Sequence, residues 1–132
     1  MNISSAPVKV LVVDDEHDVA LLFRQRFRRE IRRGEIELLF AFSGEEAIEV
    51  LNEQGRADVV LVLSDINMPG MNGLDLLRYI KSEPPPVPVC MMTAYGSEEY
   101  RRQADEIGSD GYLTKPVDFD ALKARIRDLT AV

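Results

Sequence analysis

The sequence is short of three things: cysteine, long apolar segments and net positive charge. Its single cysteine, Cys90, excludes an internal disulfide, and the apolar neighbours indicate a buried thiol, which fits a reducing compartment. No apolar run approaches the roughly 20 residues of a membrane-spanning helix, and residues 1–7 lack the basic and apolar regions of a signal peptide. We therefore expect a cytoplasmic protein with no membrane partner.

Acidic residues outnumber basic ones by 23 to 16, which gives a formal net charge of −7. This charge opposes binding to a phosphate backbone, so we expect no direct contact of this segment with nucleic acid. A chain of 132 residues with 45% hydrophobic content is large enough for one core and too small for two. We assign residues 1–132 to a single domain with its core at about residues 8–130.

Apolar runs typical of buried strands alternate five times with segments of helical periodicity. The expected strands are residues 8–13, 36–42, 59–65, 87–92 and 110–114, and the expected helices are residues 17–33, 43–53, 72–80, 97–107 and 118–129. Ser43, Asn72, Ser97 and Asp118 stand where N-caps are expected. Such alternation predicts an α/β fold in which helices cover both faces of a parallel sheet.

The expected helix over residues 17–33 combines an apolar face with many basic residues. Val19, Leu22, Phe23, Phe27 and Ile31 recur at helical spacing and predict its buried side. Its other faces carry Arg24, Arg26, Arg28, Arg29, Arg32 and Arg33. We interpret most of these arginines as solvated charges near a helix C-terminus, where positive charge is favoured, with docking to an acidic partner as the alternative.

The central feature of the sequence is the apolar run over residues 59–63, which leads through Ser64 to Asp65 and the turn signal at residues 69–70. Asp65 therefore lies at the carboxyl end of a buried strand. In open α/β sheets this is the edge at which ligands bind. Asp65 is accordingly a candidate site residue, with simple capping of the turn as the alternative.

Other expected strands also end in polar residues: Asp14 and Asp15, Thr93, and Lys115. If the strands are adjacent and parallel, these side chains meet Asp65, and carboxylate pairs at 4 Å repel by about 4 kcal/mol at an effective dielectric near 20. Such a cluster requires a cation. Oxygen ligands, with no histidine nearby except His17, favour Mg²⁺ over Zn²⁺.

This set of side chains suits phosphoryl transfer. Mg²⁺ and the Lys115 ammonium can neutralise phosphoryl oxygens, and the Thr93 hydroxyl can donate to one of them. With an unperturbed pKa of about 3.9, Asp65 is expected to be ionised at neutral pH and able to attack phosphorus directly. The product would be an aspartyl phosphate.

Four motifs together resemble the receiver domain of bacterial two-component response regulators. They are residues 12–16 (VVDDE), 65–73 (DINMPGMNG), 92–94 (MTA) and 115–116 (KP). The resemblance covers essentially the whole chain. It implies a flavodoxin-like (βα)5 three-layer sandwich with a five-stranded parallel sheet of order 2-1-3-4-5, as in flavodoxin and the chemotaxis receiver of this family. It also implies a cis peptide bond before Pro116.

The resemblance further implies a role for each site residue. Asp65 would be the phosphoacceptor of a two-component phosphorelay. Its side chain, the side chain of Asp15 and the backbone carbonyl of Asn67 would bind Mg²⁺ directly, and Asp14 would act through water. Lys115 would pair with the phosphoryl group.

A conformational switch is part of the same resemblance. Thr93 would move toward the phosphoryl group, and Tyr112 would then rotate inward and alter the surface of the fourth helix, fifth strand and fifth helix. The alternative is that Tyr112 is a half-buried strand aromatic that does not move. Asn67 and Tyr95, which the resemblance puts beside the site, would govern the lifetime of the phosphate.

The resemblance implies a signalling phosphoprotein that promotes only its own phosphorylation and dephosphorylation, not an enzyme acting on other substrates. Its partners would be a histidine kinase or histidine phosphotransfer protein and an output protein or a missing output domain, with a homodimer as a further family possibility. No output domain follows Val132 in this sequence, so we expect either a stand-alone regulator that acts by docking or the receiver part of a longer protein. A haloacid-dehalogenase-like phosphohydrolase is the alternative, but Asn67 stands where that class has a second acid. A third hypothesis is an interaction module that is never phosphorylated.

Overall fold

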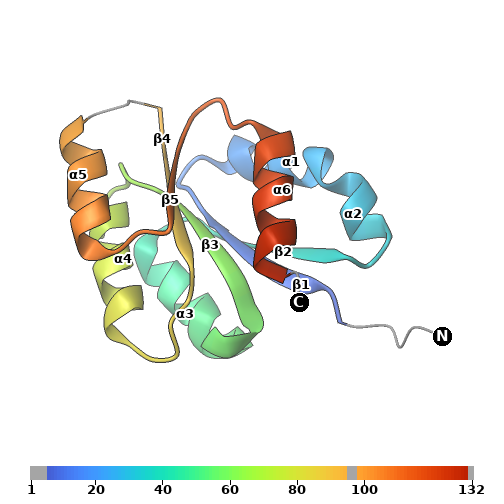
Figure 1. Cartoon of the computed structure of the whole chain (residues 1–132), viewed down its shortest axis with the longest axis horizontal. Helices are drawn as coiled ribbons and strands as arrows, with labels where there is room; N and C mark the ends of the chain where they lie inside the picture. The colour runs from blue at the N-terminus through green and yellow to red at the C-terminus, as the bar shows by residue number, and fades with distance from the viewer. Residues whose placement is uncertain (1–5, 95–97, 131–132) are drawn as a thin grey trace.

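A five-stranded parallel sheet lies between two layers of helices in the computed structural model, which describes residues 6–94 and 98–130 (Figure 1). The strand order is β2-β1-β3-β4-β5, and every neighbouring pair is parallel. This confirms the predicted fold class and the order 2-1-3-4-5. The carboxyl ends of β1, β3 and β4 therefore lie side by side at one edge of the sheet.

The elements alternate along the chain as the periodicity predicts. The strands are β1 (Val8–Val13), β2 (Ile36–Ala41), β3 (Val59–Asp65), β4 (Val89–Thr93) and β5 (Gly111–Thr114). The helices are α1 (His17–Arg26), α2 (Arg28–Arg32), α3 (Gly44–Gln54), the short 3₁₀ helix η1 (Arg56–Asp58), α4 (Gly73–Ser82), α5 (Glu98–Ile107) and α6 (Phe119–Thr130).

Each face of the sheet has its own apolar core. Alternate residues of β1, β3 and β4, including Leu11, Val62 and Met91, pack with α3, α4 and α5. The residues between them, including Val12, Leu63 and Cys90, pack with α1 and α6. Burial on both faces explains why these strands are continuously apolar. It also confirms the predicted burial of Cys90.

The single helix predicted over residues 17–33 is wrong, because the helix is interrupted at Phe27 (φ −102°, ψ 11°). Phe23 and Phe27 are fully buried, and both rings pack edge-on against Phe119 of α6, at centroid distances of 5.0 and 6.0 Å. The departure from helical dihedral angles coincides with this packing of the Phe27 ring, while the Phe27 N–H still donates to the Phe23 carbonyl at 2.9 Å. Leu22 and Ile31, predicted to be buried, are 39% and 38% exposed.

Most predicted helix starts are confirmed where the structure describes them. The Ser43 side chain accepts the Glu46 N–H, and Asn72 and Asp75 form a complete capping box. Asp118 accepts the Ala121 N–H at 3.1 Å, which anchors the start of α6. The remaining predicted cap, Ser97, lies outside the described residues. These caps position the loops that surround the carboxyl edge of the sheet.

The strand boundaries are close to those predicted. The register between β1 and β3 shifts at the start of β3, where Lys9 pairs with Val59 but Val10 pairs with Leu61. One residue of β3, Val60, therefore has no partner in β1 at this irregularity. The peptide bond between Lys115 and Pro116 is cis, as the resemblance implied, and so is the bond between Pro84 and Pro85.

Candidate functional site

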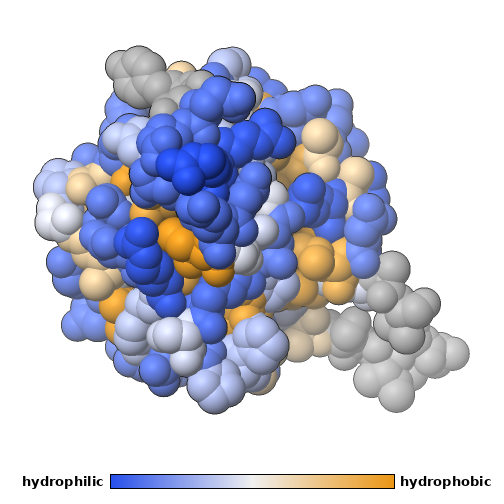
Figure 2. All heavy atoms as spheres, turned by 60° about the vertical axis from the view of Figure 1, so that its left-hand side comes forward, coloured by the Kyte–Doolittle hydropathy of each residue, from blue (hydrophilic) through white to orange (hydrophobic). Residues whose placement is uncertain are grey.

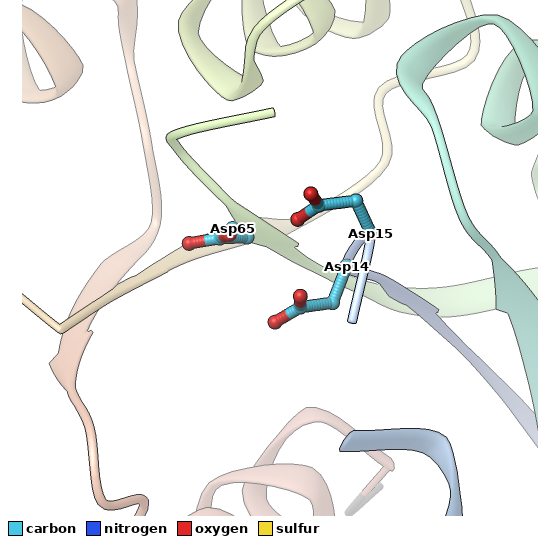
Figure 3. A group of neighbouring side chains, drawn as sticks. All are labelled: Asp14, Asp15 and Asp65. Atoms are coloured by element: carbon cyan, nitrogen blue, oxygen red, sulfur yellow. The ribbon is translucent and has the colours of Figure 1, made fainter. Parts of the chain in front are cut away.

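Three carboxylates come together where β1 and β3 end. Asp14 and Asp15 follow β1, Asp65 is the last residue of β3, and one oxygen of each lies within 4.8 Å of the others (Figure 3). The side chains of Asp14 and Asp65 are buried, with residue exposures of 3% and 7%. The structure thus places the predicted acidic residues together, because adjacent parallel strands end at the same edge.

Hydrogen bonds fix the orientation of two of these carboxylates. The Asp14 Oδ1 atom accepts the Glu16 N–H at 3.0 Å, and its Oδ2 accepts from Lys115 Nζ at 2.6 Å. The Asp65 Oδ1 atom accepts the Ile66 N–H at 3.0 Å and lies 3.6 Å from Lys115 Nζ. Lys115 therefore bridges the two buried acids, with its stronger contact to Asp14.

Burial and neighbouring charges raise the pKa values of both Asp65 and Lys115. Burial and the neighbouring Asp14 carboxylate raise the pKa of Asp65 to about 6, so the sequence-based expectation of an unperturbed value is wrong for the metal-free site. Burial by itself would lower the pKa of Lys115, but the hydrogen bond and charge of Asp14, together with Asp65, raise it overall. The lysine thus stays charged, and the site carries an excess of negative charge.

The donor set fits a hard divalent cation. All three clustered ligand atoms are carboxylate oxygens, and one ammonium offsets part of their charge. Mg²⁺ prefers oxygen ligands and is usually held by one or two carboxylates together with waters. Both Asp14 oxygens already accept protein hydrogen bonds, which favours Asp15 and Asp65 as direct ligands.

Strands β4 and β5 carry two further predicted residues: Thr93 lies at the same edge, and Tyr112 lies two positions before the last residue of β5. Thr93 is the buried last residue of β4, and its carbonyl accepts the Lys115 N–H at 2.8 Å. Tyr112 lies in β5, opposite Met91, with Arg101 5.6 Å above its ring. Burial raises the pKa of Tyr112, and its buried hydroxyl has no hydrogen-bond partner among the residues that the structure describes.

A pocket of about 390 Å³ opens over the acidic cluster. Its lining includes the predicted residues Asp15, Asp65, Asn67 and Lys115, and also Glu16 and Ala94, to which the sequence analysis gave no role. An opening beside Asp65 and Lys115 gives a small ligand access to both. Tyr95, predicted to lie near the site, falls outside the described residues.

Sequence reasoning also missed a contact made by Tyr100. The Tyr100 hydroxyl of α5 donates a hydrogen bond of 3.3 Å to Asn67 Oδ1. No signal in the sequence could have paired them, because they are 33 positions apart and the contact depends on how α5 packs. This bond links α5 to the loop that follows Asp65.

The loop after Asp65 closes tightly over the strand end at Gly73. The Gly73 N–H donates to the Ile66 carbonyl at 2.8 Å, and a Cβ added to Gly73 would stand 2.1 Å from the Asp65 carbonyl oxygen. This separation is far below van der Waals contact. Only glycine therefore allows α4 to begin this close to the candidate nucleophile.

Fold and site together match one family. The family described as the response regulator receiver domain covers residues 10–127. The chain therefore belongs to the response regulator receiver family, as the four motifs implied. This membership favours two-component signalling over the phosphohydrolase alternative.

Proteins of similar sequence support this family assignment. The response regulator protein PilR of Pseudomonas aeruginosa is 38% identical over 123 residues, which cover 93% of this chain and 25% of PilR. CpxR of Escherichia coli is 35% identical over 90% of this chain and 47% of its own length. The chain thus spans a quarter to a half of these two relatives. Sporulation initiation phosphotransferase F of Bacillus subtilis is 29% identical over 90% of each chain.

Solved structures show the same architecture. A receiver domain protein from Clostridium thermocellum aligns with a TM-score of 0.81 and 29% identity, over 92% of this chain and 93% of that one. The CheX–CheY–BeF₃–Mg²⁺ complex from Borrelia burgdorferi aligns with a TM-score of 0.82 and 26% identity, over 96% and 92%. Within the described residues, no helix is long and apolar enough to cross a membrane.

Proposed function

We propose that the chain receives a phosphoryl group on Asp65 and changes its surface in response. One observation carries this proposal: the Asp65 carboxylate ends a central strand among Asp14, Asp15 and Lys115, beside an open pocket. Such an arrangement pairs a carboxylate nucleophile with groups that can offset phosphoryl charge. The CheX–CheY complex that shares this fold contains BeF₃ and Mg²⁺, which supports the same chemistry here.

The transfer is a displacement at phosphorus. A carboxylate oxygen of Asp65 forms the new O–P bond while the bond from phosphorus to the donor nitrogen of a phosphohistidine breaks, and the imidazole leaves with the electron pair of that bond. The Ile66 N–H holds the carboxylate in place through Oδ1. Lys115 Nζ, 3.6 Å from that oxygen, is placed to pair with a phosphoryl oxygen of the product.

We assign Asp15, Asp65 and the Asn67 backbone carbonyl as direct Mg²⁺ ligands and Asp14 as a ligand through water. When bound, Mg²⁺ offsets the negative charge of the carboxylates and of the phosphoryl oxygens. Asp14 meanwhile keeps Lys115 in position through their 2.6 Å contact. With a pKa of about 6, Asp65 is mostly ionised at neutral pH, and a bound cation would lower this pKa and further increase the fraction that can act as the nucleophile.

The response to phosphorylation runs through Thr93 and Tyr112. A phosphoryl group adds about two negative charges and strong acceptors, toward which the Thr93 hydroxyl moves. The unbonded hydroxyl of Tyr112 is costly where it is buried, so the ring gains free energy by moving to a position where the hydroxyl is bonded. The surface that changes comprises α5, β5 and α6, the fourth helix, fifth strand and fifth helix of the sequence prediction.

The partners follow from the same proposal. A histidine kinase or histidine phosphotransfer protein supplies the phosphoryl group, and an output protein or domain, or a second copy of the chain, binds the altered surface. Figure 2 faces the side that carries α5, and hydrophilic residues dominate it, with hydrophobic ones in separate patches. Such a surface suits a transient partner that binds one state of the protein.

Borohydride reduction followed by peptide mapping tests the assignment. An acyl phosphate on Asp65 is converted by borohydride to homoserine, which marks the residue by mass. After incubation with a phosphodonor and Mg²⁺, we expect the conversion at Asp65 alone. Conversion at Asp14 or Asp15 would contradict the proposed site.

A further inference from the structure

A groove beside β2, the outermost strand on one side of the sheet, takes no part in the proposed phosphoryl chemistry. It lies between β2 and the helices α1 and α2 and has a volume of about 810 Å³. In the sheet, β1 and β3 separate β2 from β4 and β5, the strands that carry Thr93 and Tyr112 (Figure 1). Among the described strands, β2 pairs only with β1, so its outer edge is unpaired. This part of the molecule is therefore available to a partner.

The floor of the groove is apolar. Ile36, Leu38 and Phe40 lie at alternate positions of β2 on the face that packs toward α1, and Leu38 and Phe40 are only partly buried. Ile31 of α2 adds a side chain that is 38% exposed. This apolar surface remains in contact with water in the free chain, and covering it would be favourable.

The rim of the groove is basic. Arg24, Arg28 and Arg32 stand at every fourth position along α1 and α2, and all three are exposed. None of them forms an ion pair with a carboxylate in the described part of the chain, and Arg24 lies 4.8 Å above the ring of Phe40. Glu37 is the one acidic residue that lines the groove, so the lining has an excess of positive charge in a chain of net charge −7.

We propose that this groove docks an acidic segment of a partner protein, in which carboxylates flank one or two aliphatic or aromatic side chains. Charge complementarity selects this occupant: the apolar anchor covers the floor, and the flanking carboxylates pair with the rim. Arginine binds carboxylates in a planar, two-point geometry that lysine lacks. A row of arginines over an apolar floor therefore distinguishes this ligand from a neutral peptide.

The groove is distant from Thr93 and Tyr112, the residues of the proposed switch. We therefore expect docking in the groove to have a different role from binding of the output partner. The sheet separates the groove from the Thr93 and Tyr112 strands, so docking and phosphorylation are expected to be independent. The groove would hold the receiver close to its partner whether or not Asp65 is phosphorylated.

The test measures binding of a fluorescent peptide to the whole chain by anisotropy. The probe carries a central Leu-Leu-Phe cluster flanked by three acidic residues on each side, and the same peptide with amides in place of the carboxylates is the ligand control. We expect saturable binding of the acidic peptide, and this binding should weaken as the salt concentration rises. The amide peptide should bind at least about tenfold more weakly. Equal binding of both peptides, or no binding of the acidic one, would overturn the proposal.

A matched pair of variants separates the groove from general charge. Arg28→Ala/Arg32→Ala removes two charges from the rim, whereas Arg29→Ala/Arg33→Ala removes two charges from the same segment outside the groove. We expect the first to weaken binding about tenfold and the second less than about twofold. All four arginines are exposed, so both variants should unfold at the wild-type urea midpoint. Equal weakening by the two pairs would contradict the proposal.

Sedimentation of the wild type at the same concentrations tests the other possible occupant of the groove, a second copy of the chain. We expect a single species of monomer mass. A dimer that Arg28→Ala/Arg32→Ala dissolves would show that a second copy fills the groove and would overturn the assignment to a partner segment.

Discussion

Lys115 Nζ lies 2.6 Å from Asp14 Oδ2 but 3.6 Å from Asp65 Oδ1. The ammonium is thus held mainly by the acid that is not the proposed nucleophile. This leaves it close enough to meet a group that becomes attached to Asp65. Under the proposed function, this asymmetry would allow Lys115 to respond to a phosphoryl group on Asp65 and not only to neutralise the carboxylate beside it.

Removal of this lysine tests the distinction. We expect Lys115→Ala to leave Mg²⁺ binding largely intact, because the proposed ligands remain, but to uncouple phosphorylation from the response at Tyr112. We also expect the metal-free variant to lose about 1–3 kcal/mol of unfolding free energy, because buried Asp14 loses its charged partner. Tyr112 fluorescence or NMR resonances report the response. An unchanged phosphorylation-dependent signal would refute the role of Lys115.

Removal of an uncompensated charge should have the opposite effect on the free protein. We expect Asp15→Asn to raise the unfolding free energy of the metal-free protein by about 1 kcal/mol, because it relieves repulsion among the three carboxylates. The stabilisation of the wild type by millimolar Mg²⁺ should be largely lost in the variant. Urea unfolding with and without Mg²⁺ measures both effects, with Asp18→Asn, an exposed acid of α1, as the control. Equal Mg²⁺ stabilisation of Asp15→Asn and wild type would argue against the metal site.

The raised pKa of Asp65 predicts how stability depends on pH. The pKa rises from 3.8 to about 6 on folding, so the native metal-free protein binds more protons than the unfolded chain in this range, and its stability falls as pH rises through it. The loss assigned to Asp65 is up to about 3 kcal/mol. Urea unfolding at several pH values should show that the unfolding free energy of Asp65→Asn rises relative to that of the wild type between about pH 4 and pH 6.5. A constant difference between the two proteins would be inconsistent with the raised pKa.

Gly73 tests the geometry of the loop behind the nucleophile. A methyl group there would meet the Asp65 carbonyl oxygen at 2.1 Å, and this neighbour is backbone that cannot move without shifting the strand end. We expect Gly73→Ala to destabilise the protein by about 2 kcal/mol or more and to slow phosphorylation. Gly44→Ala is the control, because the three atoms nearest its added methyl all belong to the Met71 side chain, at 2.8–3.0 Å, and none is a backbone atom. Similar losses in both variants would show that the tight contact has no special role.

The strand ends explain why so much of the site could be predicted. Asp14, Asp65 and Thr93 each follow an apolar run, and parallel strands bring such ends to one edge. The pKa of Asp65 could not be predicted in this way, because it depends on the burial and spacing of charges that only the folded chain defines. The bond between Tyr100 and Asn67 depends in the same way on the packing of α5.

The interruption at Phe27 shows a limit of periodicity. The helical spacing of apolar residues continues through residue 31, and no proline or glycine marks the break. The non-helical backbone at Phe27 coincides with packing of its ring against Phe119, which is distant in the sequence. The sequence pattern therefore predicts that this segment is helical, but not where the helix is interrupted.

The most direct test of the account is the intact mass of the protein after incubation with Mg²⁺ and acetyl phosphate, for wild type and Asp65→Asn. We expect the wild type to gain the mass of one phosphoryl group, and the variant to gain none. A gain of the same size in Asp65→Asn would contradict the assignment of Asp65. Steady release of inorganic phosphate with no gain in the wild type would contradict the proposed switch and favour a phosphohydrolase instead.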